Sequence, residues 1–256
     1  IPALLLIHIY SGFQRTDKRT FDVSESLMKM LDESAPQNAV ILISVWTLVI
    51  QYHYYRLAEG FRTDLTVLNY DLKFTNYRSI PVMYPEFYKA IAPYYDGFVK
   101  RLGEAHPQEI YNTGCTLDSP ELMNSYRESV LAIQRYCEQT GKTYMVDPKA
   151  FVFQIQNGMM TTDSRVSGCF VSKKETGLGT GFLDLPFRWL DSPITLTEPA
   201  ATDKLVDFEA MLDFHRNLYR STGDATNLQK AENSYQRIKT LQRKVKRNMP
   251  FVFRKD

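Results

Sequence analysis

Apolar residues recur every three or four positions in several long segments, the spacing that gathers side chains on one face of an α-helix. This spacing predicts helices over residues 21–33, 46–59, 85–102, 120–140, 149–157, 202–222 and 225–247. Within 46–59, the apolar stripe that we expect to face inward is Trp46, Val49, Ile50, His53 and Leu57. Only Gly223-Asp224 separates the last two helices, so they predict an αα-hairpin.

Three short runs of mainly apolar residues lie between helices, at 39–44, 65–69 and 143–146. Runs without polar alternation are typical of strands that are buried on both faces of a parallel sheet. Strand, helix and strand over 39–69 predict a βαβ unit, which normally joins two parallel strands by a right-handed crossover. We therefore predict an α/β fold with a small, mostly parallel sheet, flanking helices and a βαβ core.

Glycines and prolines interrupt the pattern between 159 and 201, where 166–172 predicts a single strand. A loop-rich insertion is expected there. The predicted domains are the end of a transmembrane helix with an interfacial linker over 1–16, an α/β domain over 17–200, and the helical hairpin over 201–256.

The chain opens with an apolar run, 1–9, that is too short to span a membrane. Tyr10 and the cations Arg15, Lys18 and Arg19 follow it, as they do where a transmembrane helix emerges through a polar interface. We expect the last turns of such a helix here, with these three cations at the membrane surface. The alternative is a buried first strand or helix. The basic residues of 239–255 fit either a lipid-facing segment or a solvated helix end.

The composition narrows the class of protein. A net charge of +2 does not favour nucleic acid as a partner. Aromatic residues make up 13% of the chain, which suits half-wet surfaces such as interfaces and grooves, or alternatively a tyrosine-rich core. Cys115, Cys137 and Cys169 permit at most one disulfide, and the histidines lack zinc-site spacing. We expect no metal and no cofactor.

Ligands of open α/β sheets bind outside the carboxyl ends of the strands. The ligand-binding candidates at these ends are Ser44, Trp46, Asn69, Asp71 and Asp147. Carboxylates at two of three strand ends suit a sugar hydroxyl or a cation. Aspartate also caps strands and helices for purely structural reasons, and this alternative carries more weight.

Other polar groups have a structural and a functional interpretation. His53, Arg56 and Glu59 lie at three-residue steps on one predicted helix, as an acid–base site or as an ion-paired helix end with a buried histidine. We favour the second, and we place His215 in the core. The glycine-rich segment 177–181 lacks the spacing of a phosphate loop, so we expect a mobile loop or a series of turns.

Specific motifs run through the first two fifths of the chain: Pro36-Gln-Asn-Ala-Val-Ile-Leu, a Trp-bearing turn at Trp46, a core of Glu59-Gly60-x-Arg62-x-Asp64, and Tyr84-Pro85-Glu-Phe. In these motifs the stretch 17–102 resembles the post-membrane segment of a family of multi-spanning Bacteroidetes proteins. That family is described as protein O-mannosyltransferase-like, with the polytopic GT-C architecture. Related sequences usually carry an acidic residue in the turn after the first strand, where this chain has Ser44, Val45 and Thr47.

The resemblance implies that Glu59, Gly60, Arg62 and Asp64 form a structural core and that any catalysis lies outside this chain. Our first hypothesis is therefore an accessory extracytoplasmic domain of a membrane-embedded glycosyltransferase-like protein. It would sit on the periplasmic side of the cell membrane, attached through its N-terminal segment, and would contact an acceptor protein or glycan. The second hypothesis is a non-enzymatic scaffold component of a cell-envelope complex, with partner subunits. The third is a soluble α/β enzyme acting at the strand ends.

Overall fold

The computed structural model describes residues 23–72, 74–106, 117–161, 164–174, 176, 183, 190 and 199–248. The chain divides into two compact units, one formed by Ile1–Glu33 with Thr180–Asp256 and the other by Ser34–Gly179. Within the described ranges, no helix combines the length and the apolar character that a membrane span requires. The candidate membrane-surface residues Arg15, Lys18 and Arg19 lie outside these ranges.

The second unit is built on a five-stranded sheet with the strand order β2-β1-β3-β5-β4. Its strands are β1 (Val40–Ile43), β2 (Thr66–Asn69), β3 (Tyr144–Val146), β4 (Arg165–Ser167) and β5 (Phe170–Ser172). β2 and β3 both pair with β1 in parallel, in the register Val40↔Thr66 and Val40↔Tyr144. β5 extends the sheet antiparallel to β3, and β4 pairs antiparallel with β5. The predicted mostly parallel α/β sheet is confirmed.

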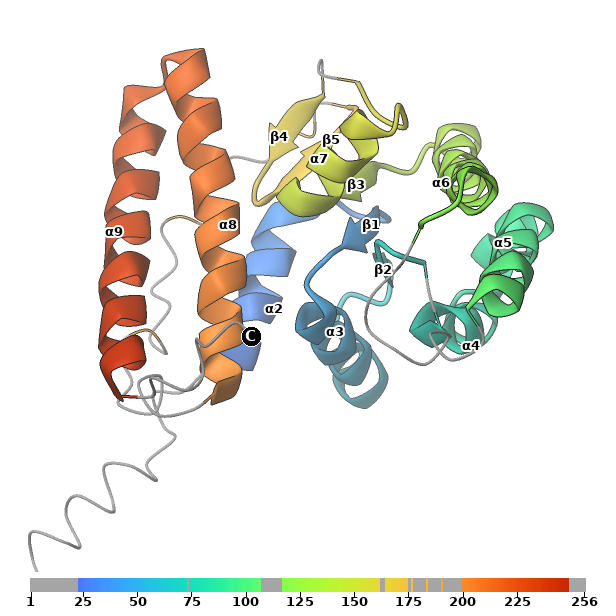
Figure 1. Ribbon diagram of the computed structural model, residues 1–256, viewed down its shortest axis with the longest axis horizontal. Helices are drawn as coiled ribbons and strands as arrows, with labels where there is room; N and C mark the ends of the chain where they lie inside the picture. The colour runs from blue at the N-terminus through green and yellow to red at the C-terminus, as the bar shows by residue number, and fades with distance from the viewer. Residues whose placement is uncertain are drawn as a thin grey trace, which may run out of the picture. The chain divides into compact units, whose positions relative to one another are not determined.

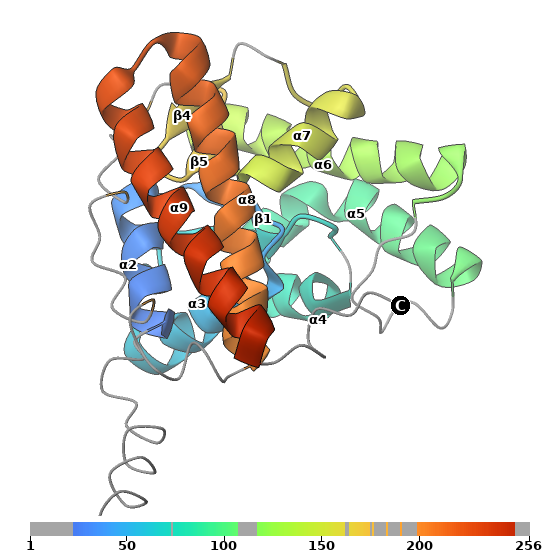
Figure 2. The ribbon, with the colours of Figure 1, turned by 60° about the vertical axis from the view of Figure 1, so that its left-hand side comes forward.

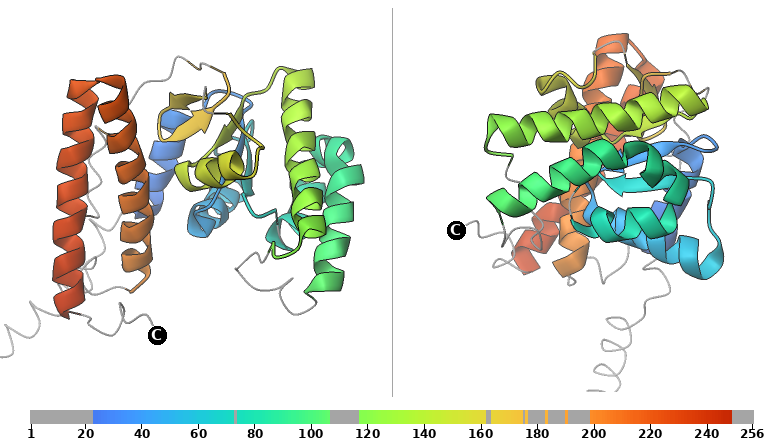
Figure 3. Two further views of the ribbon diagram at one scale, coloured as in Figure 1. Left: turned by 45° about the horizontal axis from the view of Figure 1, so that its top comes forward. Right: turned by 90° about the vertical axis from the view of Figure 1, so that its right-hand side faces the viewer.

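Every residue of β1 and β2 is buried, as expected of short, mainly apolar strands in a parallel sheet that is covered on both faces. Helices cover both faces of this sheet (Figures 1 and 3): α5 (Pro85–Ala105) and α6 (Pro120–Thr140) on one face, and α3 (Trp46–Glu59) on the other. α7 (Pro148–Gln156) packs beside α6, where the ring of Phe153 meets that of Tyr126 with the centroids 5.8 Å apart. α5 packs along α6 and also against α4 (Phe74–Met83). The buried stripe of α5 is Phe87, Ile91, Tyr95, Phe98 and Leu102, at the predicted helical spacing.

Two features of this unit differ from the sequence-based predictions. The segment 166–172 forms not one strand but the hairpin β4–β5, because Gly168 adopts a φ of 57° and reverses the chain. The hairpin packs closely: a Cβ on Gly168 would lie 2.4 Å from the Oγ of Ser34, and the backbone N–H of Cys169 donates to that oxygen at 3.1 Å. α4 was not expected, since Pro81 lies inside it.

The predicted inward stripe of α3 is wrong in part. Leu48, Val49 and Tyr52 are buried, whereas Ile50 is 47% exposed and Leu57 is 74% exposed. Ile50, Tyr54 and Leu57 follow one another at i, i+4 and i+7 and form an exposed apolar stripe, with Tyr54 63% exposed. The core side of α3 is therefore rotated relative to the prediction, towards Tyr52 and away from Ile50 and Leu57.

The first unit contains α2 (Val23–Ser34), except for its last residue, together with α8 (Pro199–Thr222) and α9 (Ala225–Asn248). α8 and α9 pack along each other as the predicted αα-hairpin (Figure 2). Glu209 of α8 accepts hydrogen bonds from Lys239 and Gln242 of α9, each at 2.6 Å. His215 is fully buried and stacks on Tyr219 with the ring centroids 5.7 Å apart, which confirms its place in the core.

Candidate functional site

The carboxyl end of β1 is joined to the carboxyl end of β3 through Ser44 and Asp147. The backbone N–H and the hydroxyl of Ser44 both donate to Oδ2 of Asp147, each at 2.5 Å. Because β2 and β3 lie on opposite sides of β1, this is the position where the direction of strand addition reverses, and open α/β sheets bind ligands at such positions. In this protein Ser44 and Asp147, the residues on either side of that position, hydrogen-bond each other.

The same carboxylate also begins α7. Oδ1 of Asp147 accepts a hydrogen bond from the backbone N–H of Ala150 at 2.8 Å, so Asp147 is the N-cap residue of this helix. Burial raises the pKa of the Asp147 carboxyl, while the hydrogen bonds from Ser44 and Ala150 act in the opposite direction. Asp147 is thus committed to internal hydrogen bonds, in agreement with the structural interpretation of this residue.

The carboxyl end of β2 forms a tight turn. Oδ1 of Asn69 accepts a hydrogen bond from the backbone N–H of Asp71 at 3.2 Å, which is an Asx-turn. Asn69 and Asp71 are both buried, with 5% and 8% of their surface exposed. Asn69 therefore shapes the turn, and the turn places Tyr70 and Asp71 beside α6 and α7.

A cavity of about 190 Å³ opens beside this turn. Its described lining residues come from the end of β2, from α6 and the segment before it, and from α7: Tyr70, Asp71, Leu117, Met123, Tyr126 and Phe153. Asp71 is therefore a cavity residue, whereas Asp147 is not among the described lining residues. The two strand-end carboxylates do not share this cavity, so they do not act together on one bound group there.

Aromatic rings form much of the cavity wall and fix one another. Phe153 meets both Tyr70 and Tyr126 edge to face, with ring centroids 5.8 Å apart in each pair. The hydroxyl of Tyr126 donates to the carbonyl oxygen of Tyr70 at 2.5 Å, which ties α6 to the end of β2. Nothing in the sequence pairs Tyr126 or Phe153 with Asp71.

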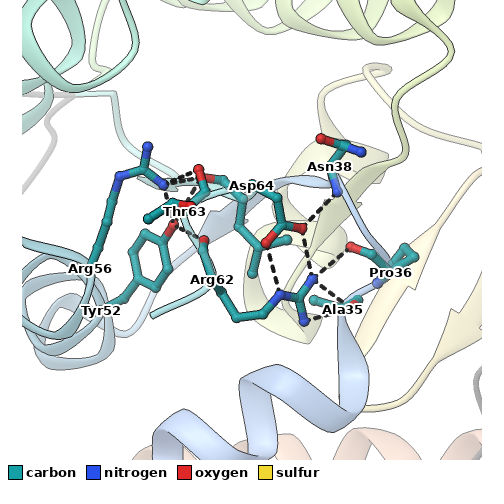
Figure 4. A network of polar contacts seen from close by, with 9 residues as sticks. Ala35, Pro36, Asn38, Tyr52, Arg56, Arg62, Thr63 and Asp64 are labelled. Carbon is teal, nitrogen blue, oxygen red and sulfur yellow. Dashed lines mark hydrogen bonds and ion pairs between the residues drawn. The ribbon is translucent and has the colours of Figure 1, made fainter. Parts of the chain in front are cut away.

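The motif from Glu59 to Asp64 lies at the opposite, amino-terminal edge of the parallel strands (Figure 4). The guanidinium of Arg62 bonds both carboxylate oxygens of Asp64, at 3.0 Å each, and donates to the carbonyl oxygens of Ala35 and Pro36. Oδ2 of Asp64 also accepts from the backbone N–H of Asn38 at 2.9 Å. We name Arg62 and Asp64 the clamp, because they hold the segment before β1 against the segment before β2.

The clamp is electrostatically coupled and sits on an unusual backbone. The hydrogen bonds from Arg62 hold the pKa of the Asp64 carboxyl below its usual value. Arg62 has a φ of 40°, a conformation that costs energy for a residue with a side chain. Gly60, the C-cap of α3, has a φ of 66°, which suits glycine. The geometry agrees with the structural role that the resemblance implies for Gly60, Arg62 and Asp64, while Glu59 is an exposed residue at the end of α3.

A second set of hydrogen bonds supports the clamp from α3. Tyr52 donates to the carbonyl oxygens of Arg62 and Leu65, and Arg56 donates to the hydroxyl of Tyr52 at 3.1 Å. Nε2 of His53 lies 3.1 Å from the carbonyl oxygen of Val67, and burial lowers the pKa of this histidine. His53 is half-buried and hydrogen-bonded, which agrees in part with the expected buried histidine. Arg56 donates to carbonyl oxygens of the loop after α3.

The remaining candidates from the sequence form no disulfide and no metal site among the described residues. Cys137 and Cys169 are both free and buried, so they do not bridge each other, and Cys115 lies outside the described residues. The side chain of Trp46, at the first position of α3, and the segment 177–181 are likewise outside them. No group of three or more histidine, cysteine or carboxylate side chains in the described part could hold a metal ion.

Comparison with known proteins finds no relative, because no family model, no curated protein and no solved structure matches the chain.

Proposed function

We propose that the chain is an accessory, non-catalytic domain of a membrane-embedded glycosyltransferase-like protein, held on the extracytoplasmic side of the membrane. We propose further that the carboxyl edge of its sheet contacts the acceptor protein or glycan. The observation that carries the proposal is the cavity at the end of β2, where aromatic rings and the carboxylate of Asp71 line a single concave site. Small-molecule sites combine such an apolar wall with a few placed polar groups.

The polar residues at the strand ends are largely used in hydrogen bonds within the protein, which supports a binding rather than a catalytic role. Asp147 caps α7 and holds Ser44, and the clamp keeps the amino-terminal edge closed. Among the described residues, the aromatic cavity at the end of β2 is the place on the carboxyl edge where we propose that a ligand binds. An accessory domain needs such a recognition surface and no reacting groups of its own.

The proposal is tested on the complete gene product in two steps. A topology reporter fused after residue 256 and carbonate extraction of membranes should place the chain in the membrane fraction with its domain outside the cytoplasm. Recovery in the aqueous fraction, or a reporter that is active only in the cytoplasm, would contradict the membrane part. In the second step, NMR titration of the chain with mannose-containing oligosaccharides and glycopeptides should shift the ring signals of Tyr70, Tyr126 and Phe153 saturably. The binding part is wrong if only residues remote from the cavity respond.

The exposed stripe on α3 favours a second candidate, a scaffold component that holds a partner subunit. Ile50, Tyr54 and Leu57 present apolar side chains at the spacing by which a helix docks onto another protein. A photo-crosslinking amino acid at position 54 should then capture one defined subunit of the envelope complex in the cell. Replacing Leu57 by serine should abolish that product. The hydropathy upstream of residue 1 separates the candidates further, since a multi-span region supports the first and a single anchor the second.

A further inference from the structure

A hollow at the amino-terminal edge of the sheet is lined by three lysines that flank two different strands. Lys142 lies two residues before β3, and Lys173 and Lys174 directly follow β5. β5 runs antiparallel to β3, in the register Met145↔Ser172, so its last residues lie beside the first residues of β3. The hollow has a volume of about 30 Å³, and one water needs roughly 10–15 Å³ on the same measure, so a group of a few atoms fits.

The described part of the wall of this hollow is positive. Besides the three lysines, Glu138 of α6 is the charged residue among the described lining residues, which gives this wall a net formal charge of +2. Lys173 and Lys174 are exposed and Lys142 is half-buried, so a dissolved ligand can reach all three side chains. A hollow lined by cations raises the local concentration of anions and disfavours cations.

Neutral groups hold two of these cations in place. The ammonium group of Lys173 donates to Oε1 of Gln134 at 2.7 Å, and the amide nitrogen of this buried glutamine donates to the carbonyl oxygen of Met159 at 2.9 Å. The ammonium group of Lys142 lies 5.5 Å from the centroid of the Tyr136 ring, a cation–π contact. A neutral partner orients a cation without cancelling its charge. Two of the three side chains are therefore partly ordered before an anion arrives, which lowers the entropy cost of binding it.

The floor of the hollow experiences the same positive charges. Cys137 lies there and is only 2% exposed. Burial raises the pKa of its thiol to about 12, while the charges of Lys142 and Lys174 act in the opposite direction. The ammonium groups of these two lysines therefore lie near enough to the floor to stabilise negative charge in the hollow.

We propose that this hollow binds a phosphate monoester group, with its oxygens between the ammonium groups of Lys142, Lys173 and Lys174. At neutral pH such a group carries a charge of about −1.5 to −2, which matches the positive wall better than a carboxylate does. Lysine binds phosphate as a point charge. The inference does not depend on the proposed function, because the hollow and the cavity at the end of β2 lie at opposite edges of the sheet. A small phosphorylated molecule and a lipid headgroup share this chemistry, and the test distinguishes the two sources.

The test compares two ligands of similar shape and different charge on the unaltered chain. Methyl phosphate and methyl sulfate are titrated at about pH 8, where the phosphate is a dianion and the sulfate a monoanion. Methyl phosphate should shift the backbone amide NMR signals of the three lysines saturably and bind at least about threefold more tightly than methyl sulfate. No saturation with methyl phosphate, or equal affinities for the two ligands, would overturn the proposal.

Vesicles identify the source of the phosphate. The chain is sedimented with phosphatidylcholine vesicles that contain phosphatidic acid and, as the control, with vesicles of phosphatidylcholine alone. Retention on the first kind alone, reversed by methyl phosphate, supports the site with a lipid headgroup as its ligand. Binding of methyl phosphate without retention on either kind supports the site with a soluble phosphorylated molecule as its ligand.

Variants locate the binding. Lys142→Met, Lys173→Met and Lys174→Met each remove one charge, and each should weaken the binding of methyl phosphate at least about threefold. Lys149→Met is the matched control, because Lys149 is an exposed cation of α7 outside the described lining of the hollow, and it should have no effect. Circular dichroism checks that each variant folds, and a variant that does not fold leaves the other two to decide. If the folded lysine variants all bind methyl phosphate as tightly as the unaltered chain, the site is wrongly assigned.

Discussion

Ser44 and Asp147 are 103 residues apart in the chain, and two hydrogen bonds of 2.5 Å join them where β1 and β3 end. The carboxylate of Asp147, a ligand-binding candidate from the sequence, therefore links the end of β1 to the start of α7 by hydrogen bonds. Its removal should act on stability before it acts on binding.

Asp147→Ala should lower the free energy of unfolding by about 2–4 kcal/mol, because it deletes a helix N-cap and leaves the two donors of Ser44 without their acceptor. Asp147→Asn, which can still cap α7, should cost about 1–2 kcal/mol. Urea denaturation followed by circular dichroism measures both. Equal losses in the two variants would mean that the cap contributes nothing.

The clamp should make the fold sensitive to acid. Since Arg62 holds the pKa of the Asp64 carboxyl below its usual value, its contribution is complete above the unfolded pKa, about 3.8, and is lost as the pH falls through the lower folded pKa. Asp64→Asn should remove this part of the acid dependence and destabilise the fold by about 1–3 kcal/mol at neutral pH. Urea denaturation of the unaltered chain and of Asp64→Asn, repeated at several pH values between about 2 and about 7, measures this difference in acid dependence.

Asp147 should show the reverse sign. Its pKa is raised by burial, so the contribution of this group to stability is present at low pH and is lost as the pH rises from the unfolded pKa through the folded one. The difference in unfolding free energy between the unaltered chain and Asp147→Asn should therefore shrink with rising pH in this window. A difference that grows instead would contradict the assigned direction.

Gly168 should be intolerant of any side chain. Its φ of 57° disfavours other residues, and an added Cβ would lie 2.4 Å from Ser34. Gly168→Ala should cost about 2–4 kcal/mol, the sum of backbone strain and overpacking. Gly141→Ala is the matched control, because Gly141 has a φ of 71° with open space around it, and about 1 kcal/mol is expected there. Thermal denaturation of the two variants separates crowding from backbone strain.

The two buried thiols should be inert in the folded protein. Burial raises the pKa of Cys137 and that of Cys169 to about 12, so at neutral pH almost no thiolate is present. In a Cys115→Ser background, labelling with an aromatic disulfide reagent should be slow in buffer and fast in urea. Rapid labelling of either thiol under native conditions would show that the protein around it opens readily.

The sequence predicted the parts of the fold that local chemistry determines. The mainly apolar runs 39–44 and 65–69 identified β1 and β2, and the helical spacing over 120–140 identified α6. Gly168 was a visible interruption, but its consequence depends on Ser34, which is more than a hundred residues earlier. The sequence analysis did not predict the rotation of α3, because it considered only the spacing of apolar residues. In the structure the hydroxyl of Tyr52 hydrogen-bonds two backbone carbonyl oxygens, which the apolar spacing does not indicate.

The candidate site was predictable only in outline. The carboxyl edge of the sheet was the expected place, and Asp71 does line a cavity there. That Asp147 is engaged inside the protein depends on hydrogen bonds from Ser44 and Ala150 that no sequence pattern specifies. Tyr126 and Phe153 reach the cavity from separate helices, so their meeting with Asp71 is a property of the tertiary structure.

The short sequence separation between the residues that the clamp joins affects the order in which the protein folds. Arg62 closes a loop of 26 residues back to Pro36, whereas the bond from Ser44 to Asp147 closes one of 103 residues. Loop closure for the longer one costs about 1 kcal/mol more entropy. During folding, the segment from 34 to 72 should therefore consolidate first, and β3 with its hairpin should add to a nucleus that already exists. A chain emerging from the ribosome would have that nucleus complete long before its last helices are made.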